Sequence, residues 1–413
     1  MIDIKLLREN PDKVKRGIKN KEVDIDIDRI LKLDKKRREL IQQIENLKAE
    51  KNKLIAKDIE KGREIKEKIK NLEPELKEIE KEFSNLMLQV PNLPLDDVPI
   101  GKDESENKVI REFGKKPKFG FKPKDYMELA EKLDIIDVKR AAKVSGTRFD
   151  YLKGGAVYLE FALIQLALDS LVKQGFIPVI PPIMIKTEMM KGMGYVERGG
   201  EEIYYLPKDN LCLVGTSEQS IGPMHANEIF NEKELPKRYV AFSPCFRREA
   251  GSYGKDTKGI FRVHQFYKVE MFSFCHPDKS KQEHQFFLKM EEKLMQLLKI
   301  PYRVVQMCTG DLGDPAAAKY DIEAWLPSEN RYRETHSTSN CTDFQARRLN
   351  IRYKAKDGKP SLPAGRLNFV HTINGTALAT GRMIIAIIEN YQQKDGSVKI
   401  PAVLQKYIKI KKI

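Results

Sequence analysis

Residues 243–272 read SPCFRREAGSYGKDTKGIFRVHQFYKVEMF, and this stretch says more about the fold than any other part of the 413-residue chain. Two runs typical of β-strands flank a loop rich in glycine and in charges of both signs. Because side chains alternate along a strand, Arg247 and Glu249 are expected on one face of the first run, with Val263 and Glu270 on the second. An arginine at a strand end can grip a phosphate with two hydrogen bonds, and an acid two residues on can hold an amine or an adenine amino group.

The same charges are also typical of an ordinary surface hairpin with a salt-bridged loop. Two well-known nucleotide signatures are missing from the sequence. The segment GSYGKDT at 251–257 has glycines only three apart and an acid after its lysine, unlike a P-loop, and no predicted strand is followed by GxGxxG and a helix. A bound nucleotide would therefore have to be held by separate side chains.

Length and charge limit the classes of protein to which the chain can belong. A chain of 413 residues predicts two or three domains, and 41% hydrophobic residues are enough for a sizeable core. The formal net charge is +15 and the isoelectric point is near 9.3, which indicates a polyanionic partner, either nucleic acid or an anionic surface. Charge alone does not choose between them.

The cysteines and the N-terminus indicate a reducing compartment. The five cysteines lie about 30 residues apart, with no CxxC pair and no compact Cys/His cluster, so we expect no zinc site and no disulfide framework. The N-terminus MIDIKLLREN lacks the apolar core of a signal peptide. The longest apolar run, at 158–172, is interrupted by Glu160, Gln165 and Asp169 and predicts an amphipathic helix rather than a membrane span. The expectation is a cytoplasmic protein without a membrane partner.

Residues 27–88 predict an antiparallel coiled-coil hairpin. Apolar residues recur at alternating spacings of four and three in both halves, with the turn expected near 58–62. Pro74 lies inside the second half, where a proline removes a backbone donor, so we expect a kink or break just before it. The predicted seam is Leu33, Arg37, Leu40, Ile44, Leu47, Lys51 and Leu54 in the first helix, and Ile65, Ile69, Leu72, Leu76, Ile79, Phe83 and Leu86 in the second.

Charge is uneven along this hairpin. Residues 29–57 hold 10 basic and 4 acidic side chains, a net of +6, whereas residues 58–82 hold 7 and 9, a net of −2. Most coiled coils of this kind are solvated and serve only dimerisation. A basic helix attached to a large body is also suited to follow a phosphate backbone, and the candidate contacts are Lys35, Lys36, Arg37 and Arg38.

A linker rich in proline and acid follows at 89–108, and from about residue 115 strands and helices mix. Neighbouring strands with short turns indicate a mostly antiparallel sheet with helices packed on it, an α+β body. Helices are expected near 125–133, 154–174, 281–299 and 376–391, and strands at 203–206, 239–242, 260–274, 302–308 and 320–326.

Five ordered segments together resemble the class II aminoacyl-tRNA synthetases, in the form carried by seryl-tRNA synthetases. The opening stretch resembles their motif 2. The helix GGAVYLEFALIQLALDSLV at 154–172 with IPPI at 180–183 is similar to motif 1, LVGTSEQS at 213–220 to the TxE loop, and NGTALATGRMIIAIIENYQ at 374–392 to motif 3. RYRETHSTSNCTDFQARRLNIRYK at 331–354 corresponds to the segment that the family uses at ATP and its metal. The coiled-coil arm and the linker match as well, so the resemblance spans essentially the whole chain.

The resemblance implies a class II α+β fold, with an antiparallel sheet and flanking helices, and a site for ATP and L-serine. Arg247 and Arg382 are implied as catalytic clamps on the phosphates, and Glu334 with Ser337 as ligands of the Mg²⁺ that accompanies ATP. The implied ATP-binding residues are Arg247, Arg248, Glu249, Val263, Glu334, Thr335, His336, Ser337 and Arg382. The implied serine-binding residues are Thr216, Ser217, Glu218, Arg247, Glu270 and Thr376. Thr376 and His336 stand where the family commonly has serine.

The resemblance also implies partners and a division of the chain. Residues 1–100 would form a tRNA-binding domain whose coiled-coil arm covers about 27–88, and residues 101–413 would form the catalytic domain. The implied partners are tRNA(Ser), tRNA(Sec) and a second copy of the chain in a homodimer.

Three alternatives remain open at this point. A synthetase for threonine or proline is the first, although the threonine enzymes use a Cys/His zinc site and both usually carry a C-terminal anticodon-binding domain, whereas 31 residues follow Arg382. A non-catalytic nucleic-acid-binding scaffold is the second, and the joint presence of Arg247, Glu249, Glu334 and Arg382 argues against it. A homologue that charges a carrier protein is the third, and the coiled-coil arm disfavours it.

Overall fold

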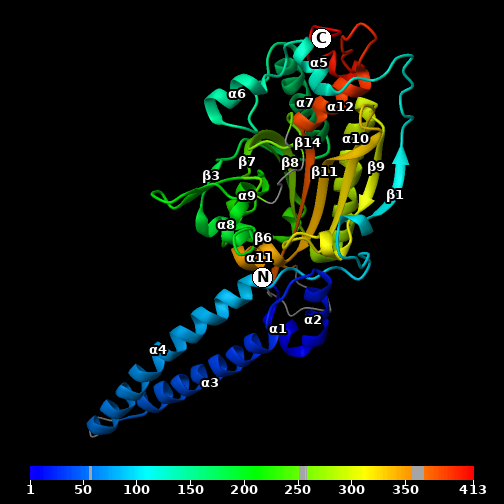
Figure 1. Ribbon diagram of the computed structural model, residues 1–413. Coiled ribbons are helices and arrows are strands. Elements are labelled where there is room, and N and C mark those ends of the chain that lie inside the picture. Colours follow the sequence, from blue (N-terminus) through cyan, green and yellow to red (C-terminus); the bar gives the residue numbers. More distant parts are fainter. Residues whose placement is uncertain (55–57, 251–255, 257, 356–366) are drawn as a thin grey trace. The chain divides into compact units, whose positions relative to one another are not determined.

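The structure is a computed structural model that describes residues 1–54, 58–250, 256, 258–355 and 367–413 (Figure 1). The chain divides into two compact units, Met1–Leu93 and Pro94–Ile413, each with hydrophobic clusters of its own. The segment GSYGKDT lies outside the described residues except for Asp256, so its comparison with a P-loop stays untested.

The described part of the first unit is helical, and its two long helices form the predicted hairpin. Asp26 caps the N-terminus of the first long helix, Ile27–Lys51, because its carboxylate accepts a hydrogen bond from the backbone nitrogen of Arg29 at 2.9 Å. The apolar residues of the predicted seam are confirmed in two clusters, one around Leu33, Leu40 and Ile79 and the other around Ile44, Ile65 and Ile69, whereas Lys51 is exposed. The helices are α1 (Ile4–Glu9), α2 (Pro11–Asn20), α3 (Ile27–Lys51) and α4 (Ile59–Gln89).

Two details of the hairpin differ from the prediction. Residues 59–62, expected in the turn, form the beginning of α4. Of the kink or break expected before Pro74, the break is wrong, because α4 continues through the proline, and the kink stays a prediction. Pro74 removes one backbone donor, but Leu72 and Leu76 on either side of it pack into the seam, and this packing holds the helix together.

The second unit is built on a sheet of eight described strands in the order β1-β9-β10-β11-β14-β8-β7-β2 (Figure 1). Neighbouring strands run antiparallel except β2 and β7, which confirms the mostly antiparallel α+β body. The strands are β1 (Lys108–Phe113), β2 (Ile177–Val179), β7 (Lys237–Phe246), β8 (Gln265–Cys275), β9 (Tyr302–Gln306), β10 (Ala318–Leu326), β11 (Arg331–Thr342) and β14 (His371–Ala379).

Two three-stranded sheets and the remaining helices complete the unit. One small sheet has the order β13-β12-β6 and the other β3-β5-β4. Their strands are β3 (Met184–Lys186), β4 (Tyr205–Leu206), β5 (Leu211–Leu213), β6 (Ile229–Asn231), β12 (Arg352–Lys354) and β13 (Leu367–Phe369). The helices are α5 (Tyr126–Lys132), α6 (Val138–Ser145), α7 (Gly155–Val172), α8 (Thr187–Met193), α9 (Glu218–Ile221), α10 (Ser280–Leu298), α11 (Phe344–Leu349) and α12 (Thr380–Tyr391).

Side-chain alternation along β8 separates the core from a cavity. Val269 and Met271 are fully buried in the largest hydrophobic cluster, together with residues of α7, α10 and α12. Lys268 and Glu270, which alternate with them, line the cavity. Among the described helices, α7 is the one whose length and hydropathy would suffice for a membrane span, but half of it is buried in the protein, as in a core helix.

Several predicted boundaries need correction. β8 begins at Gln265, so residues 260–264 precede the strand and Val263 does not share it with Glu270. The helix expected at 376–391 begins at Thr380, because residues 371–379 form β14 and pair with β8. The helices expected near 125–133, 154–174 and 281–299 are confirmed as α5, α7 and α10.

Candidate active site

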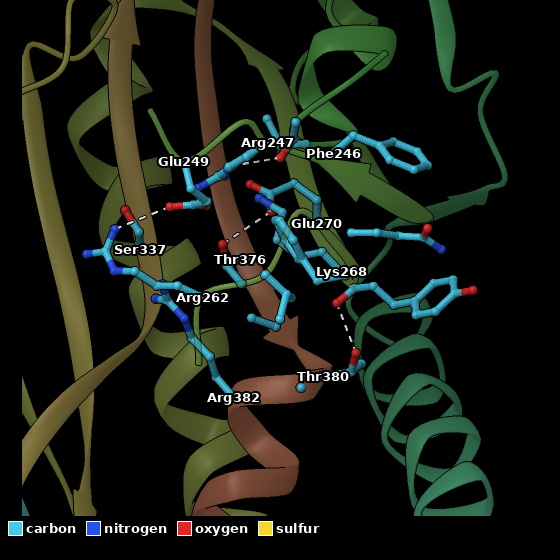
Figure 2. A pocket seen from close by; sticks show the side chains of 18 of the residues that line it. Phe246, Arg247, Glu249, Arg262, Lys268, Glu270, Ser337, Thr376, Thr380 and Arg382 are labelled. Atoms are coloured by element: carbon cyan, nitrogen blue, oxygen red, sulfur yellow. Dashed lines mark hydrogen bonds and ion pairs between the residues drawn. The ribbon is translucent and has the colours of Figure 1, made fainter. Parts of the chain in front are cut away.

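A cavity of about 1200 Å³ lies on the side of the sheet that carries Lys268 and Glu270 (Figure 2). Its size is ample for a nucleotide together with a small amino acid. Most residues that the resemblance assigned to ATP and serine line this one cavity: Thr216, Glu218, Arg247, Glu249, Val263, Glu270, Glu334, Thr335, His336, Ser337, Thr376 and Arg382.

Arg247 and Glu249 reach the cavity by a different route from the expected one. The strand β7 ends at Phe246 and Glu249 has a φ of 50°, so the two residues do not alternate along an extended segment. The Nε atom of Arg247 donates to the carbonyl oxygen of Gly215 at 3.1 Å, which fixes the guanidinium against the wall. Glu249 Oε2 lies 3.4 Å from Arg262 Nη1. The turn after β7, rather than strand alternation, brings both side chains into the cavity.

Glu334 and Arg382 form a charged end of the cavity. Arg382, in the first turn of α12, places its Nη1 atom 3.3 Å from Glu334 Oε1. Burial alone would raise the pKa of Glu334, but the charges of Arg382, Lys319 and Arg247 outweigh burial and lower that pKa to about 2. The Glu334 carboxylate is therefore ionised at neutral pH, facing a cavity that also holds arginines.

A β-bulge next to Glu334 determines how the neighbouring residues Thr335 and His336 are placed. The pairing of β10 with β11 shifts there, so Thr335 has no partner across the ladder, while His336 pairs with Ile322. Thr335 Oγ1 lies 2.8 Å from His336 Nδ1, and burial lowers the pKa of His336 to about 3, which keeps the ring neutral. His336 Nε2 has no hydrogen-bond partner among the residues that the structure describes. A contact of this ring with a nucleotide stays a prediction.

The other end of the cavity is a buried acidic pocket. Glu270 Oε2 lies 2.5 Å from Lys268 Nζ and accepts a hydrogen bond from Thr376 Oγ1 at 3.2 Å (Figure 2). The hydroxyl of Tyr195 donates to Glu218. Burial and the nearby charge of Glu270 raise the pKa of Glu218 to about 7. Two carboxylates against one lysine leave a pocket suited to a small ligand that carries an ammonium group.

Two assigned residues do not line the cavity, and a third is placed well for a ligand. Ser217 is fully buried behind the wall, with its Oγ atom 2.8 Å from Ser243 Oγ. The guanidinium of Arg248 lies 5.7 Å from the ring centroid of Tyr204. Contacts of the Ser217 and Arg248 side chains with a substrate stay predictions. By contrast, Thr216 Oγ1 is buried on the wall without a hydrogen-bond partner in the described parts of the chain.

Sequence reasoning missed three residues of this site. Lys268 is one of them, although it stands two residues before Glu270 on one strand face, and the alternation in KVE could have revealed it. Phe261 places its ring 4.7 Å from the guanidinium of Arg382, an apolar face inside a basic cavity that suits a planar base. Tyr195 follows α8, far in sequence from its partner Glu218, so no local pattern signals it.

In the first unit, the four candidate cations of the arm are all paired with acids. Arg37 also lies over the ring of Phe83, at 5.8 Å from its centroid. The pairs of Lys35, Lys36 and Arg37 are solvent-accessible, and such pairs are worth about 0–1 kcal/mol, so a phosphate can replace their carboxylates at small cost. Arg38 differs, because its partner Asp34 is only 1% exposed and is also paired with Arg8. The pairs are Lys35 with Glu39 (4.0 Å), Lys36 with Glu75 (2.6 Å), Arg37 with Glu80 (3.1 Å) and Arg38 with Asp34 (3.1 Å).

The antiparallel sheet, the cavity beside it and the arginine at the start of α12 define a class II aminoacyl-tRNA synthetase core. Residues 204–391 match the family described as "tRNA synthetase class II core domain (G, H, P, S and T)". Residues 1–94 match the "Seryl-tRNA synthetase N-terminal domain". The chain belongs to the seryl-tRNA synthetase family, as the sequence motifs predicted.

Relatives of known name match the chain over its full length. A serine–tRNA ligase from Dictyoglomus turgidum is 45% identical over 428 residues, which cover 100% of this chain and 99% of the relative. The crystal structure of seryl-tRNA synthetase from Pyrococcus horikoshii complexed with ATP has a TM-score of 0.94 and 44% identity, covering 100% of this chain and 99% of that one. The cytoplasmic serine–tRNA ligase of Naegleria fowleri in complex with AMP has a TM-score of 0.90 and 36% identity, covering 100% and 98%.

Proposed function

We propose that the chain is an ATP-dependent serine–tRNA ligase, which activates L-serine as seryl-adenylate and transfers it to tRNA(Ser). The observation that carries the proposal is one cavity that joins an acidic pocket around Glu270 to a charged end around Arg382, with the charge of Arg247 acting on carboxylates of both. An amino acid bound by its ammonium at one end would present its carboxylate to a phosphate held at the other.

In the first step the serine carboxylate attacks the α-phosphate of ATP in line, the bond to pyrophosphate breaks, and seryl-adenylate remains. The step needs no general base, because a carboxylate is already a nucleophile at neutral pH. Arg247 and Arg382 neutralise the charge that develops on the phosphate oxygens, and the fixed distance between the two ends of the cavity supplies proximity.

ATP in this class is accompanied by a divalent metal, and we assign the ion as Mg²⁺ at Glu334 and Ser337. The donors fit, since Glu334 is ionised and Mg²⁺ takes one or two carboxylates and completes its shell with phosphate oxygens and water. Across the described residues, no three His, Cys, Asp or Glu side chains group into a metal cage, which agrees with an ion carried mainly by the nucleotide. Bound there, the ion neutralises phosphate charge. Lack of a zinc requirement stays a prediction.

Selectivity for serine is assigned to Thr216, Glu218, Glu270 and Thr376. Within the part of the chain that the structure describes, the hydroxyl of Thr216 is buried and has no hydrogen-bond partner, so an amino acid without its own hydroxyl leaves a polar group unsatisfied in this pocket. Thr376 adds a methyl group beside Glu270, and this methyl limits the room for the larger side chain of threonine.

We assign residues 1–100 as the tRNA-binding domain and 101–413 as the catalytic domain. In the second step the terminal adenosine hydroxyl of tRNA attacks the activated carbonyl and AMP leaves. The basic face of α3, with Lys35, Lys36, Arg37 and Arg38, is the assigned contact with the phosphate backbone. We include tRNA(Sec) as a second substrate of the same reaction.

We further propose a cytoplasmic homodimer. Large apolar side chains on α7, in β2 and just beyond β2 are exposed on this chain, which is costly unless they are covered. Their exposed fractions are 61% for Tyr158, 62% for Phe161, 47% for Ile177 and 85% for Ile180. Light scattering that gives the mass of one chain at micromolar concentration would contradict the dimer.

Aminoacylation with radiolabelled serine tests the complete reaction. Transcripts of tRNA(Ser) and tRNA(Sec) are expected to accept serine, while a tRNA(Pro) transcript of equal concentration is not. Formation of seryl-adenylate without charging of either transcript would contradict the proposed transfer step.

A further inference from the structure

Glu160 of α7 contacts the start of α12 in the cavity wall, and none of the roles above uses it. Its Oε1 atom lies 2.6 Å from Thr380 Oγ1, and the same Thr380 Oγ1 lies 2.9 Å from the backbone oxygen of Tyr267. Glu160 is 6% exposed and Thr380 is fully buried, so water does not replace these contacts. Three elements therefore meet at one hydroxyl group: α7, β8 and the first residue of α12.

The number of hydrogens at this hydroxyl decides the charge of Glu160. A threonine hydroxyl has one hydrogen, whereas an ionised carboxylate and a backbone carbonyl are both acceptors only. With Glu160 ionised, one of the two contacts would lack a hydrogen, at a buried position where that is costly. A protonated Glu160 resolves this, because Oε1–H donates to Thr380 Oγ1, and Thr380 in turn donates to the oxygen of Tyr267.

We propose that Glu160 is a positioning residue that, in its protonated form, holds the start of α12 against β8. Thr380 precedes Arg382 by two residues, and Tyr267 precedes Lys268, so this chain of hydrogen bonds fixes both ends of the substrate cavity. The inference rests on the proposed function for its kinetic readout and on hydrogen-bond geometry for the proton.

The charges around Glu160 agree with a neutral carboxyl group. Burial raises the pKa of Glu160 to about 7, and the charge of Asp150, which precedes α7, raises it further. Burial also raises the pKa of Asp150, to about 6. From α12 and β8 the nearest titratable cations are engaged elsewhere, since Arg382 pairs with Glu334 and Lys268 with Glu270. Glu160 Oε2 has no partner within the described ranges.

Serine-dependent ATP–pyrophosphate exchange between about pH 6 and about pH 8.5 tests the proposal. The KM for ATP of the unaltered protein is expected to rise roughly five- to tenfold as pH passes through the range in which Glu160 ionises. Glu160→Gln should remove this rise, because an amide donates to Thr380 at every pH. Thr380→Val should show the raised KM at every pH, and Thr380→Ser should behave as the unaltered protein.

Two further variants separate positioning from general effects. Asp150→Asn removes the neighbouring negative charge and so makes the ionised form of Glu160 more favourable. The midpoint of the KM rise should therefore move to a lower pH. Glu188→Gln, an exposed carboxyl on α8, should leave the profile unchanged. Superimposable ATP profiles of the unaltered protein and Glu160→Gln would overturn the proposal.

Thermal unfolding gives a readout that does not depend on activity. A carboxyl whose pKa is raised by folding stabilises the native state while protonated and loses that contribution as pH rises through its folded value. The melting temperature of Glu160→Gln minus that of the unaltered protein should therefore increase from about pH 5 to about pH 8.5. A difference that is flat with pH would refute the bound proton, whereas a rising difference without any serine-dependent exchange would refute the proposed function alone.

Discussion

Lys268 Nζ lies 2.5 Å from Glu270 Oε2 in the cavity wall, with only 7% and 2% of the two side chains exposed. The pair neutralises one of the two acids in the pocket and leaves Glu218, held by Tyr195, as the second. A buried carboxylate without a cation is expensive. The ammonium group of a bound amino acid supplies that missing charge, so the ionised form of Glu218 is favoured when the pocket is filled.

Glu270→Ala should destabilise the protein by about 3–5 kcal/mol, because it leaves the buried ammonium of Lys268 without its partner. Chemical denaturation measures this loss, and serine-dependent exchange should disappear as well. The double variant Lys268→Met with Glu270→Leu should recover most of the stability without recovering exchange. Equal stability of the single and double variants would contradict this explanation, because the loss in Glu270→Ala would then not come from the unpaired charge of Lys268.

Arg382→Ala should lower the rate of pyrophosphate exchange by about 10²–10³-fold, comparable to the loss of one donor that stabilises developing charge. Because Arg382 also pairs with Glu334 at 3.3 Å, some loss of melting temperature is expected as well, so exchange is measured at a temperature at which both proteins are folded. Arg331→Ala, which removes an exposed arginine paired with Glu329, is the matched control and should retain full exchange. A similar loss in both variants would contradict the assigned role.

Serine affinity should increase with pH up to about pH 7 and then level off. Burial and Glu270 raise the pKa of Glu218 to about 7 in the empty pocket, whereas the ammonium of serine favours the ionised carboxylate, so binding releases a proton below that pH. Calorimetry in two buffers of different ionisation enthalpy counts the proton. Glu218→Gln should bind serine more weakly with no proton released. Proton uptake on binding would contradict the account.

The four-cation variant of α3, with Lys35, Lys36, Arg37 and Arg38 changed to alanine, should weaken tRNA binding and leave tRNA-free exchange intact. If each cation meets a phosphate, the slope of log K against log salt should fall by about 3. Changing Lys66, Lys68, Lys70 and Lys77 of the more acidic α4 is the matched control and should cost less. Equal loss of exchange and tRNA binding in the α3 variant would exclude the arm as the tRNA contact.

The sequence predicted the hairpin well because a heptad seam is a local pattern with one geometric solution. Pro74 shows the limit of such local prediction. A proline inside a helix costs stability, but packing of the seam on both sides of Pro74 outweighs that cost and α4 continues. Helices α5, α7 and α10 were likewise predicted from the sequence. Residues 376–379 were predicted to be helical, but they pair with β8 and belong to β14.

The site was predicted through motifs rather than geometry. Arg247 and Glu249 do reach one cavity, but the positive φ of Glu249 and the end of β7 cannot be read from alternation. The partners Tyr195 and Glu160 come from segments far along the chain from Glu218 and Thr380, and only folding brings them together. Buried hydrogen bonds between such distant segments can be identified only from the three-dimensional structure.

Amino-acid-dependent ATP–pyrophosphate exchange without tRNA tests the central claim most directly. The assay compares serine, threonine, alanine and proline at equal concentration with Mg²⁺ and ATP. The account predicts exchange with serine alone, because only serine combines an ammonium for the acidic pocket with a hydroxyl for Thr216 in the space that Thr376 leaves. Exchange with another of these amino acids in place of serine, or with none while the folded protein binds ATP, would contradict it.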